Sequence, residues 1–578
     1  MIGIRKVLLD FHRRHPELQH LASACGPSSS RSPPPPALVD KVRNKASKVL
    51  KLAPSQGQQH HPASPWRFAL VRRVLEEAGD PDLEIARWLR DGTPVGIASP
   101  ILPSGLLPLV DESPGLSIAD LQQQVQWTHN HPSFDALEVS SSSSSPSAPP
   151  AHALLADLVD EGHALIFTSR EAAASWLGTE PIPSPLGDVV KLKADGSYKH
   201  RLIQDLKASC VNAASRVPER QVLPRFVDHA RDIALATQHG DEVGVFVIDF
   251  SNAFMTLPLA AAEQPYNTSV APHLVRRSRP ALYADEPETG TFLVWRVLGF
   301  GGHSNPLTYS RVASFAARSA QAMLMDKPEE SPVAQGRLQL YVDDPALTLR
   351  GSVVQQHLAI DVVLLWWMCL GIPLAWSKGA YMDGRTPHEW IGVKFWSSAA
   401  ASATMSITGS FLESLLEVAA KFTSPSPRTA SLRDAHQLCG KAGRLAQVVP
   451  AAKPFVGQLF AALAASLRST AQGLREAPPK KVAKKRFRTA ASWVVALLRN
   501  QPFRLEHSIF LTSQLVDRHE AHVEFDASPW GGAFVFYEGT EAMEYGVTVW
   551  DDKSAEHLGV KPALPKWQTF WELATPVA

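Results

Sequence analysis

The sequence has few cysteines and no segment suited to crossing a membrane. Its 578 residues include only four cysteines, scattered without a CxxC pair, which argues against a zinc site and against a disulfide framework. The apolar run from Val362 to Trp376 is too short to span a bilayer and is broken by Gly371 and Pro373. No N-terminal stretch has the apolar centre of a secretory signal. We therefore expect a soluble protein without a membrane partner, in a reducing compartment, the nucleus or the cytoplasm.

A strong overall charge is also lacking. The 57 Lys and Arg residues are balanced by 56 Asp and Glu residues, and the net charge of +1 identifies no polyanionic partner. Basic residues are concentrated locally instead, in residues 5–14, 41–51 and 479–488. Such runs are more often solvated helix faces than binding surfaces, and the last one also resembles a nuclear-import signal. We take them only as support for a nucleic-acid partner.

Two stretches that are too poor in apolar residues to pack interrupt the chain. Residues 26–36 and 140–150 are rich in Ser and Pro, which is typical of linkers. Between them, residues 65–92 have helical apolar spacing. The predicted divisions are a basic, Pro- and Ser-rich region at 1–64, a small helical module at 65–135, a Ser/Pro linker at 136–150, a mixed domain at 151–400, a mostly helical region at 401–515 and a terminal domain at 516–578.

The mixed domain alternates short apolar strands with helices, so we expect an α+β fold. Near the end of the chain, HVEFDASPWGGAFVFYEG predicts a hairpin whose turn is supplied by Trp530, Gly531 and Gly532. The other expected elements are strands within 242–250, 291–298, 338–342 and 388–395, and helices within 311–325 and 353–371.

One predicted strand carries two adjacent aspartates. In GRLQLYVDDPALTLRG, residues 336–351, the alternation of apolar residues predicts a β-hairpin with Asp343 and Asp344 at its tip. Like charges at a tip repel each other unless water or a cation screens them. An isolated Asp-Asp-Pro is most often a solvated turn, because Asp and Pro are turn formers. A functional interpretation therefore requires a third carboxylate elsewhere.

The third carboxylate is Asp249, at the end of the strongly apolar run VGVFVI. Together with Asp343 and Asp344 it offers the kind of carboxylate set that binds two hard divalent cations about 3.5–4 Å apart. Such a pair of ions suits phosphoryl transfer. One ion activates an attacking hydroxyl, and the other holds a triphosphate and neutralises the leaving pyrophosphate.

These residues resemble motifs of the reverse transcriptases of retroelements, in particular those of long-terminal-repeat and tyrosine-recombinase (DIRS-like) retrotransposons. Asp249 with Ala253 and Phe254 is similar to the first palm motif, D-x-x-x-A-F/Y, and YVDD at 341–344 matches Y-x-D-D. An ordered set of segments is far more specific than any one motif. The further segments, in the family's order, are a fingers hairpin at 193–207, LGFGGHSNP at 298–306, GIPLAWSK at 371–378, the primer-grip hairpin EWIGVKF at 389–395 and a thumb-like segment at 438–455.

The resemblance implies a right-hand polymerase fold, with fingers and palm at 151–400 and a helical thumb and connection at 401–515. It also implies that Lys193 and Arg201 grip the incoming triphosphate. Taken alone, these two residues are more readily interpreted as solvated hairpin charges. Their position within the ordered motifs favours the triphosphate.

Four further residues gain roles from the same resemblance. Phe254 would exclude a ribose 2′-hydroxyl, and it could also be ordinary core. Gly301 would let the template and nucleotide approach the backbone, and Tyr341 would lie in the substrate site. Lys378 would be a candidate general acid for pyrophosphate, although a Lys near a helix end is usually a dipole partner.

The terminal hairpin resembles the first strand pair of a ribonuclease H-like domain. Asp526 in FDASPWGGAF would be its first metal ligand, and Glu572 in WQTFWELA its second. That nuclease needs further carboxylates from later elements, and the chain stops at Ala578. We expect an incomplete ribonuclease H-like α/β segment at the C-terminus; the alternative is an acidic hairpin followed by an unrelated helix end.

The expected function is RNA-directed DNA polymerisation by a retrotransposon enzyme. The implied cofactors are two Mg²⁺ ions, which Mn²⁺ could replace, and the partners are an RNA or DNA template, a primer and dNTPs. Gly299 stands where the family usually has proline, and Asn252 where many members have a second aspartate. These departures leave open an alternative, a catalytically decayed or recruited element remnant that binds nucleic acid without catalysis. The sequence also leaves the oligomeric state open.

Overall fold

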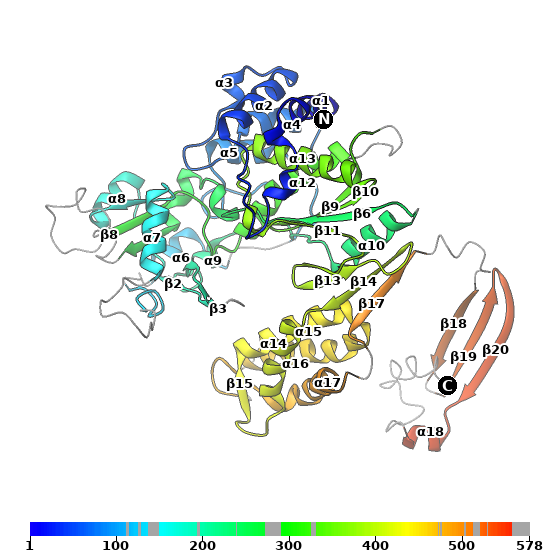
Figure 1. Cartoon of the computed structure of the whole chain (residues 1–578). Coiled ribbons are helices and arrows are strands. Elements are labelled where there is room, and N and C mark those ends of the chain that lie inside the picture. The colour runs from blue at the N-terminus through cyan, green and yellow to red at the C-terminus, as the bar shows by residue number, and fades with distance from the viewer. Residues whose placement is uncertain are drawn as a thin grey trace. The chain divides into compact units, whose positions relative to one another are not determined.

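Helices and strands are mixed throughout the larger part of the chain, which confirms the α+β class. The chain forms two compact units, Met1–Ile509 and Phe510–Ala578, and each is described by itself (Figure 1). This computed structural model describes residues 1–110, 115–124, 129–136, 150–192, 197–238, 240–271, 291–324, 331–471, 473, 477–501, 504–511, 521–528 and 530–557.

A four-stranded antiparallel sheet occupies the centre of the larger unit (Figure 1). Its strand order is β11–β6–β10–β9. Helices α10 and α13 both pack on β6 and β10, so these two inner strands are buried on both faces and are almost wholly apolar. The bounds are β6 Val243–Val247, β9 Gln335–Tyr341, β10 Asp344–Arg350, β11 Ala380–Asp383, α10 Phe226–Thr237 and α13 Val353–Leu370.

Helix α13 is a core helix. Its Trp366 and Trp367 are buried, and their indole N–H groups donate to Ser319 Oγ and the Ala316 carbonyl of α12 (Asn305–Leu324), at 2.9 and 3.2 Å. Among the described residues, α13 alone is long and apolar enough to cross a membrane, but 67% of it is buried inside the protein. Both tryptophans therefore join α13 to α12 within the core.

Smaller sheets form the part of the chain that precedes and flanks β6. Strands β1, β8 and β7 form one sheet, and β2–β5 and β3–β4 form two antiparallel pairs. The expected strand within 291–298 is β8, which pairs with both β1 and β7. The bounds are α6 Ile118–Gln122, α7 Pro150–Asp160, β1 Ala164–Phe167, α8 Arg170–Leu177, β2 Leu186–Asp188, β3 Lys191–Leu192, β4 Tyr198–Lys199, β5 Leu202–Gln204, α9 Val211–Ala214, β7 Thr268–Ala271 and β8 Thr291–Trp295.

The predicted helical region at 401–515 is largely helical, but it also contains short strands. Strands β14 and β17, near its two ends, join the hairpin β12–β13 in a second four-stranded sheet of order β12–β13–β14–β17. Helices α14 to α17 pack together between them in sequence, and a small β15–β16 pair lies beside them (Figure 1). The bounds are β12 His388–Trp390, β13 Val393–Trp396, β14 Ser402–Ile407, α14 Gly409–Thr423, β15 Thr429–Ser431, α15 Leu432–Val448, α16 Lys453–Ala471, β16 Lys481–Ala483, α17 Arg488–Asn500 and β17 Glu506–Phe510.

The N-terminal helices belong to the main hydrophobic core, so the separation of 1–64 and 65–135 from the central domain is not seen. Leu8 of α1, Val42 of α2, Leu70 of α4 and Leu89 of α5 are fully buried in one cluster with α12, α13 and the central sheet. In the sequence, the basic residues of α1 and α2 make the apolar side of each helix hard to recognise. The bounds are α1 Ile2–Arg14, α2 Pro36–Val49, α3 Pro54–Gly57, α4 Phe68–Ala78 and α5 Glu84–Asp91.

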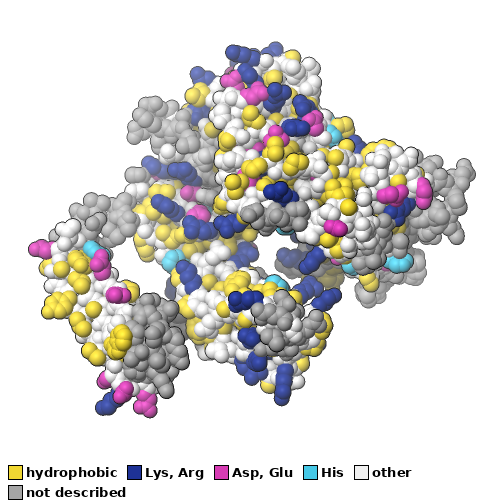
Figure 2. Space-filling view, turned by 180° about the vertical axis from the view of Figure 1, so that it is seen from behind, with side chains coloured by type: hydrophobic (Ala, Val, Ile, Leu, Met, Phe, Trp, Pro, Cys, Tyr) yellow, Lys and Arg dark blue, Asp and Glu magenta, His cyan; other side chains and the backbone are white. Residues whose placement is uncertain are grey.

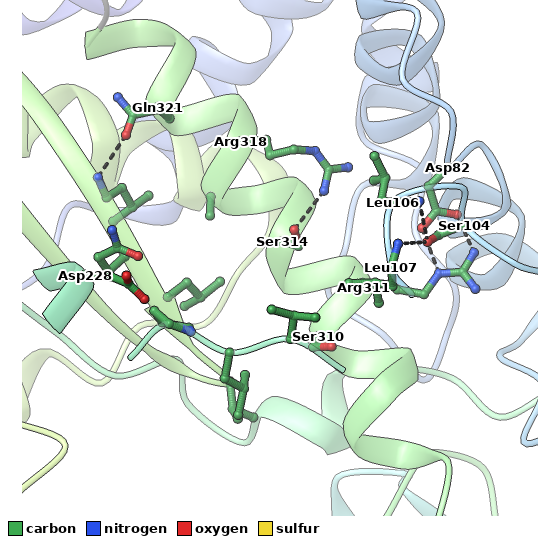
Figure 3. Close-up of a pocket in the computed structure, with 18 residues that line it drawn as sticks. Asp82, Ser104, Leu106, Leu107, Asp228, Ser310, Arg311, Ser314, Arg318 and Gln321 are labelled. Carbon is green, nitrogen blue, oxygen red and sulfur yellow. Dashed lines mark hydrogen bonds and ion pairs between the residues drawn. The ribbon is translucent and has the colours of Figure 1, made fainter. Parts of the chain in front are cut away.

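Buried ionic contacts tie this N-terminal part to α12. Arg311 donates to both carboxylate oxygens of Asp82, at 2.8 and 2.5 Å, and also faces Glu219 at 3.5 Å. Figure 3 shows the Arg311 guanidinium beside Asp82 and Ser104 at one side of a cavity of about 390 Å³. The side chains of Arg311, Asp82 and Glu219 are at most 2% exposed. The Arg311 guanidinium also lies over the Trp88 ring, 4.3 Å from its centre. A buried pair of this kind fixes α12 against the N-terminal helices.

The smaller unit contains a three-stranded antiparallel sheet of order β18–β19–β20. Its bounds are β18 Ala521–Ser528, β19 Gly531–Glu538, β20 Glu541–Val549 and α18 Asp552–His557. The predicted hairpin is confirmed, but Gly531 and Gly532 are the first residues of β19, opposite Ser528 and Ala527, instead of forming the turn. A Cβ on Gly531 would lie 2.3 Å from the Thr548 carbonyl oxygen, which explains why glycine is needed there.

Candidate polymerase active site

Strand register brings two of the predicted catalytic aspartates face to face. Strand β6 pairs antiparallel with β10, with Val247 opposite Ala346. The ladder continues beyond β6, because the Ile248 N–H donates to the Pro345 carbonyl at 3.3 Å and the Phe250 N–H to the Asp343 carbonyl at 2.8 Å. Asp249 therefore lies opposite Asp344. Residues so placed, between two hydrogen-bonded pairs, have Cα atoms about 4.5 Å apart and side chains on one face.

The third aspartate lies in the turn of the β9–β10 hairpin. Tyr341 pairs with Asp344, which leaves Val342 and Asp343 as a two-residue loop. The predicted hairpin is thus confirmed, but Asp343 alone is in the turn and Asp344 begins β10. Val342 has φ +60°, a conformation that a β-branched residue adopts only when its surroundings impose it. Strain of this kind is concentrated at functional sites.

Lys378 lies on the other side of Asp249. The Asp249 carbonyl accepts the Ala375 N–H at 2.9 Å, which holds the segment that leads to Lys378 against the end of β6. Lys378 ends the short helix η6 (Trp376–Lys378), and its ammonium forms an ion pair with the Asp249 carboxylate. The Lys378 side chain is 54% exposed and that of Asp249 14%. Lys378, Asp249 and Asp344 therefore form a row across the sheet.

Burial makes two of the aspartates reluctant to ionise. Desolvation, followed by the charge of Asp343, raises the pKa of Asp344 from 3.8 to about 6. Desolvation also raises the pKa of Asp343, while Arg201 and Lys199 act in the opposite direction. Both carboxylates raise the pKa of the buried Tyr309 phenol, to which burial contributes most. The two aspartates and Tyr309 therefore share one poorly solvated space.

The donor set has the chemistry of a divalent-cation site, although it is not assembled as one. Asp249, Asp343 and Asp344 supply carboxylate oxygens, the ligands that Mg²⁺ prefers, and burial raises the pKa of the last two. Within the described ranges, however, no three acidic, His or Cys side chains converge closely enough to hold an ion. Coordination of two ions by the three aspartates therefore stays a prediction. In this structure the Lys378 ammonium pairs with Asp249.

The basic side of the site comes from the hairpins before β6. Arg201 is fixed by two backbone hydrogen bonds with Val189, at 2.9 and 3.1 Å, and its guanidinium lies 5.7 Å from the centre of the Phe300 ring. Lys199, which sequence reasoning missed, acts electrostatically on Asp343, Asp344 and Lys378. Lys193 lies outside the described residues. Lys and Arg side chains also line the hollowed surface of the larger unit seen in Figure 2.

Phe254 is both packed and placed at the site. It belongs to the short helix η3 (Ala253–Thr256) and makes edge contacts with Phe300 at 5.6 Å and Tyr309 at 5.4 Å. It is half-buried against the main core. The Arg201 guanidinium lies over the Phe300 ring. On the other side, the charges of Asp343 and Asp344 raise the pKa of Tyr309. The ring therefore stands between the predicted triphosphate residue and the carboxylates.

The structure shows why residue 301 is glycine. Gly301 has φ +122°, and a Cβ there would lie 1.9 Å from the Gln204 carbonyl oxygen of β5. The Gln204 N–H in turn donates to the Phe300 carbonyl at 3.0 Å. Close approach of two protein backbones is thus sufficient to require glycine, and contact with template or nucleotide stays a prediction. Tyr341, half-buried opposite Asp344, also keeps its substrate role only as a prediction.

A pocket of about 210 Å³ opens beside the aspartates. Asp249, Asp344 and Lys378 line it together with Glu389, Trp390 and Ile391 of the β12–β13 hairpin. The Trp390 indole N–H donates to the Asp344 carbonyl at 3.1 Å. In the sequence this hairpin resembles a primer grip, which stays a prediction, but Glu389 was not identified as a residue of the site. Its only signal was its position in EWIGVKF.

Only one of the two predicted nuclease ligands lies within the described residues. Asp526 is exposed on β18, opposite Ala533 of β19. Glu572 lies outside the described residues. Coordination by this pair stays a prediction.

The site consists of two strand-end aspartates, a third aspartate in a tight hairpin and basic residues opposite them. These are the parts of a nucleotidyl-transfer site. Residues 192–395 match the family described as "Reverse transcriptase (RNA-dependent DNA polymerase)". This part of the chain is a reverse transcriptase domain, and its family is one of nucleotidyltransferases. The predicted family is confirmed at this level.

Two solved structures of the foamy viral protease-reverse transcriptase are similar to the chain. The one in complex with double-stranded DNA is 15% identical, with a TM-score of 0.41, and the match covers 80% of this chain and 60% of that one. The one in complex with an RNA/DNA hybrid is 15% identical, with a TM-score of 0.36, and the match covers 69% of this chain and 42% of that one. The chain thus spans less than two thirds of either. No curated protein sequence matches the chain.

Proposed function

We propose that the chain is an active RNA-directed DNA polymerase of a retrotransposon, which adds dNTPs to a primer 3′-hydroxyl. One observation carries the proposal: the β6–β10 register that sets Asp249 opposite Asp344, beside Asp343 in the turn. Like charges directly opposite in a sheet are destabilising, so this arrangement is retained for a purpose other than folding. Transfer of a nucleotidyl group is the chemistry that it serves.

Each side chain has a definite part in this mechanism. Asp249, Asp343 and Asp344 would hold two divalent ions, Mg²⁺ or Mn²⁺, which when bound supply activation of the 3′-hydroxyl and neutralisation of the pyrophosphate. Arg201, steadied on Phe300, would hold the triphosphate from the opposite side. Lys378, which pairs with Asp249, would donate a proton to the leaving pyrophosphate.

A second function has its own support. The paired Lys378 and Asp249 and the absence of a closed acidic cluster among the described residues would also suit a remnant that binds nucleic acid without catalysis. In that protein, Lys378 would remain on Asp249 when Mg²⁺ is present. The two proposals therefore differ in Mg²⁺-dependent chemistry and not in nucleic-acid binding.

Primer extension distinguishes them. The full chain is incubated with a DNA primer on an RNA template, dNTPs and Mg²⁺, and binding of the same primer–template is measured in parallel by fluorescence anisotropy. We expect extension to the end of the template, lost when EDTA replaces Mg²⁺. Binding without extension in either Mg²⁺ or Mn²⁺ would support the remnant and contradict an active polymerase.

A further inference from the structure

The loop that carries Lys378 is held by residues far outside the reverse transcriptase domain. Residues 20–26, here called the N-terminal strap, reach this loop at their C-terminal end. The Gly26 N–H donates to the Trp376 carbonyl at 2.9 Å. Trp376 begins the short helix that ends at Lys378, so this bond acts on the backbone two residues before the lysine.

The other end of the strap is fixed to helix α13. The Asp361 carboxylate is 2% exposed and accepts the backbone N–H groups of His20 and Leu21, at 2.8 and 2.6 Å. The His12 Nε2 of α1 lies 2.8 Å from the same carboxylate. A buried carboxylate with several donors is a strong anchor. The strap therefore runs from a fixed point on α13 to the loop of Lys378.

Close packing joins the strap to the residue that follows Lys378. A Cβ on Gly379 would lie 2.6 Å from Cys25 Sγ and 2.8 Å from Cys25 Cβ. Rotation of the thiol cannot relieve both contacts, because the Cβ atom moves only with the backbone. Gly379 itself has an ordinary φ of −65°, so close packing, and not backbone conformation, explains its lack of a side chain.

We propose that the N-terminal strap positions Lys378 for nucleotide addition, and that residues 20–26 are thus a working part of the polymerase site. The inference rests on the proposed function, in which Lys378 donates a proton to pyrophosphate. The Lys378 side chain is 54% exposed, and its backbone fixes where the flexible stem begins. That backbone lies between Asp249, bonded to Ala375, and the strap, bonded to Trp376. Cys25 and Gly26 are positioning residues, since neither contacts substrate.

Substitution and rescue test the contact. Gly379→Ala should clash with Cys25, displace Lys378 and lower kcat for single-nucleotide addition by roughly ten- to a hundredfold, with KM for dNTP little changed. Adding Cys25→Gly removes both clashing atoms and should restore most of kcat. The same Gly379→Ala change should have little further effect in a Lys378→Met background. Ser28→Ala, an exposed change just beyond the strap, is the control and should act as wild type.

An equal loss of kcat in the wild-type and Lys378→Met backgrounds, or no rescue by Cys25→Gly, would show that the strap is only structural and overturn the inference. Alkylation of Cys25, followed by mass spectrometry, is a test that does not depend on enzyme activity. Gly379→Ala should raise the rate of Cys25 alkylation, because the new methyl group displaces the thiol from its packed position. An unchanged rate would overturn the packing itself. A wild-type chain without extension activity but with this alkylation response would refute the proposed function, and with it the role of Lys378, while leaving the strap contact in place.

Discussion

Neutralising Asp344 should make the folded protein more stable while abolishing its proposed activity. The folded state raises the pKa of this carboxyl from 3.8 to about 6, through burial first and the neighbouring Asp343 second. The folded protein therefore holds a proton more tightly than the unfolded chain. The contribution of Asp344 to stability is fully present below pH 4 and is lost as pH rises toward 6, above which its penalty is constant. Asp344→Asn removes that penalty.

The shift sets the size of the effect. Two pKa units correspond to about 3 kcal/mol, and the partial exposure of Asp344 reduces this to about 1–2 kcal/mol through solvent screening. Above pH 7 in EDTA, the variant should therefore exceed wild type by about 1–2 kcal/mol in free energy of unfolding. The difference should fall toward zero near pH 4. Mg²⁺ should stabilise the wild type but not the variant.

Urea unfolding at pH 4.5 and pH 8, with and without Mg²⁺, measures all of these quantities. Asp383→Asn, at the exposed end of β11, is a matched control that should change neither the stability nor its pH dependence. A difference between Asp344→Asn and wild type that is the same at both pH values, or a variant less stable than wild type at pH 8, would refute the reasoning.

Three further perturbations test other parts of the account. Phe254→Ala should raise ribonucleotide use relative to dNTP use in single-nucleotide insertion, and unchanged sugar selectivity would leave Phe254 with a packing role alone. Gly301→Ala should lower the free energy of unfolding by about 1–3 kcal/mol, because its Cβ would overlap the Gln204 carbonyl; an unchanged urea midpoint would contradict this close approach. Arg311→Leu should cost about 3–5 kcal/mol, since it strands Asp82 in the core, and a loss under 1 kcal/mol would show that water reaches that carboxylate.

Local patterns in the sequence predicted the centre of the site well. The apolar run ending in Asp249 and the alternation around Asp343 are properties of single strands, and both strands formed as expected. Helix α13 and the β12–β13 hairpin followed from equally local spacing. The facing of Asp249 and Asp344 was not predictable in detail, because register is set by pairing between segments distant in the chain.

Long-range packing accounts for what the sequence did not show. The polar composition of residues 1–64 concealed Leu8 and Val42, whose apolar stripe is narrow and is buried only once α13 is in place. The Lys378–Asp249 pair was not predictable, because it joins two segments that are distant in the sequence. The strap was missed because the Gly26–Trp376 bond joins residues that no sequence pattern relates.

The most direct test of the central claim compares two neutralised aspartates in one extension assay. Asp249→Asn removes a carboxylate from the proposed polymerase site, and Asp526→Asn makes the same change on the exposed face of β18 in the other unit. With a DNA primer on an RNA template, dNTPs and Mg²⁺, we expect wild-type extension from Asp526→Asn and none from Asp249→Asn, with primer–template binding retained by both. Mg²⁺-dependent extension by Asp249→Asn at a rate near that of wild type would contradict the account.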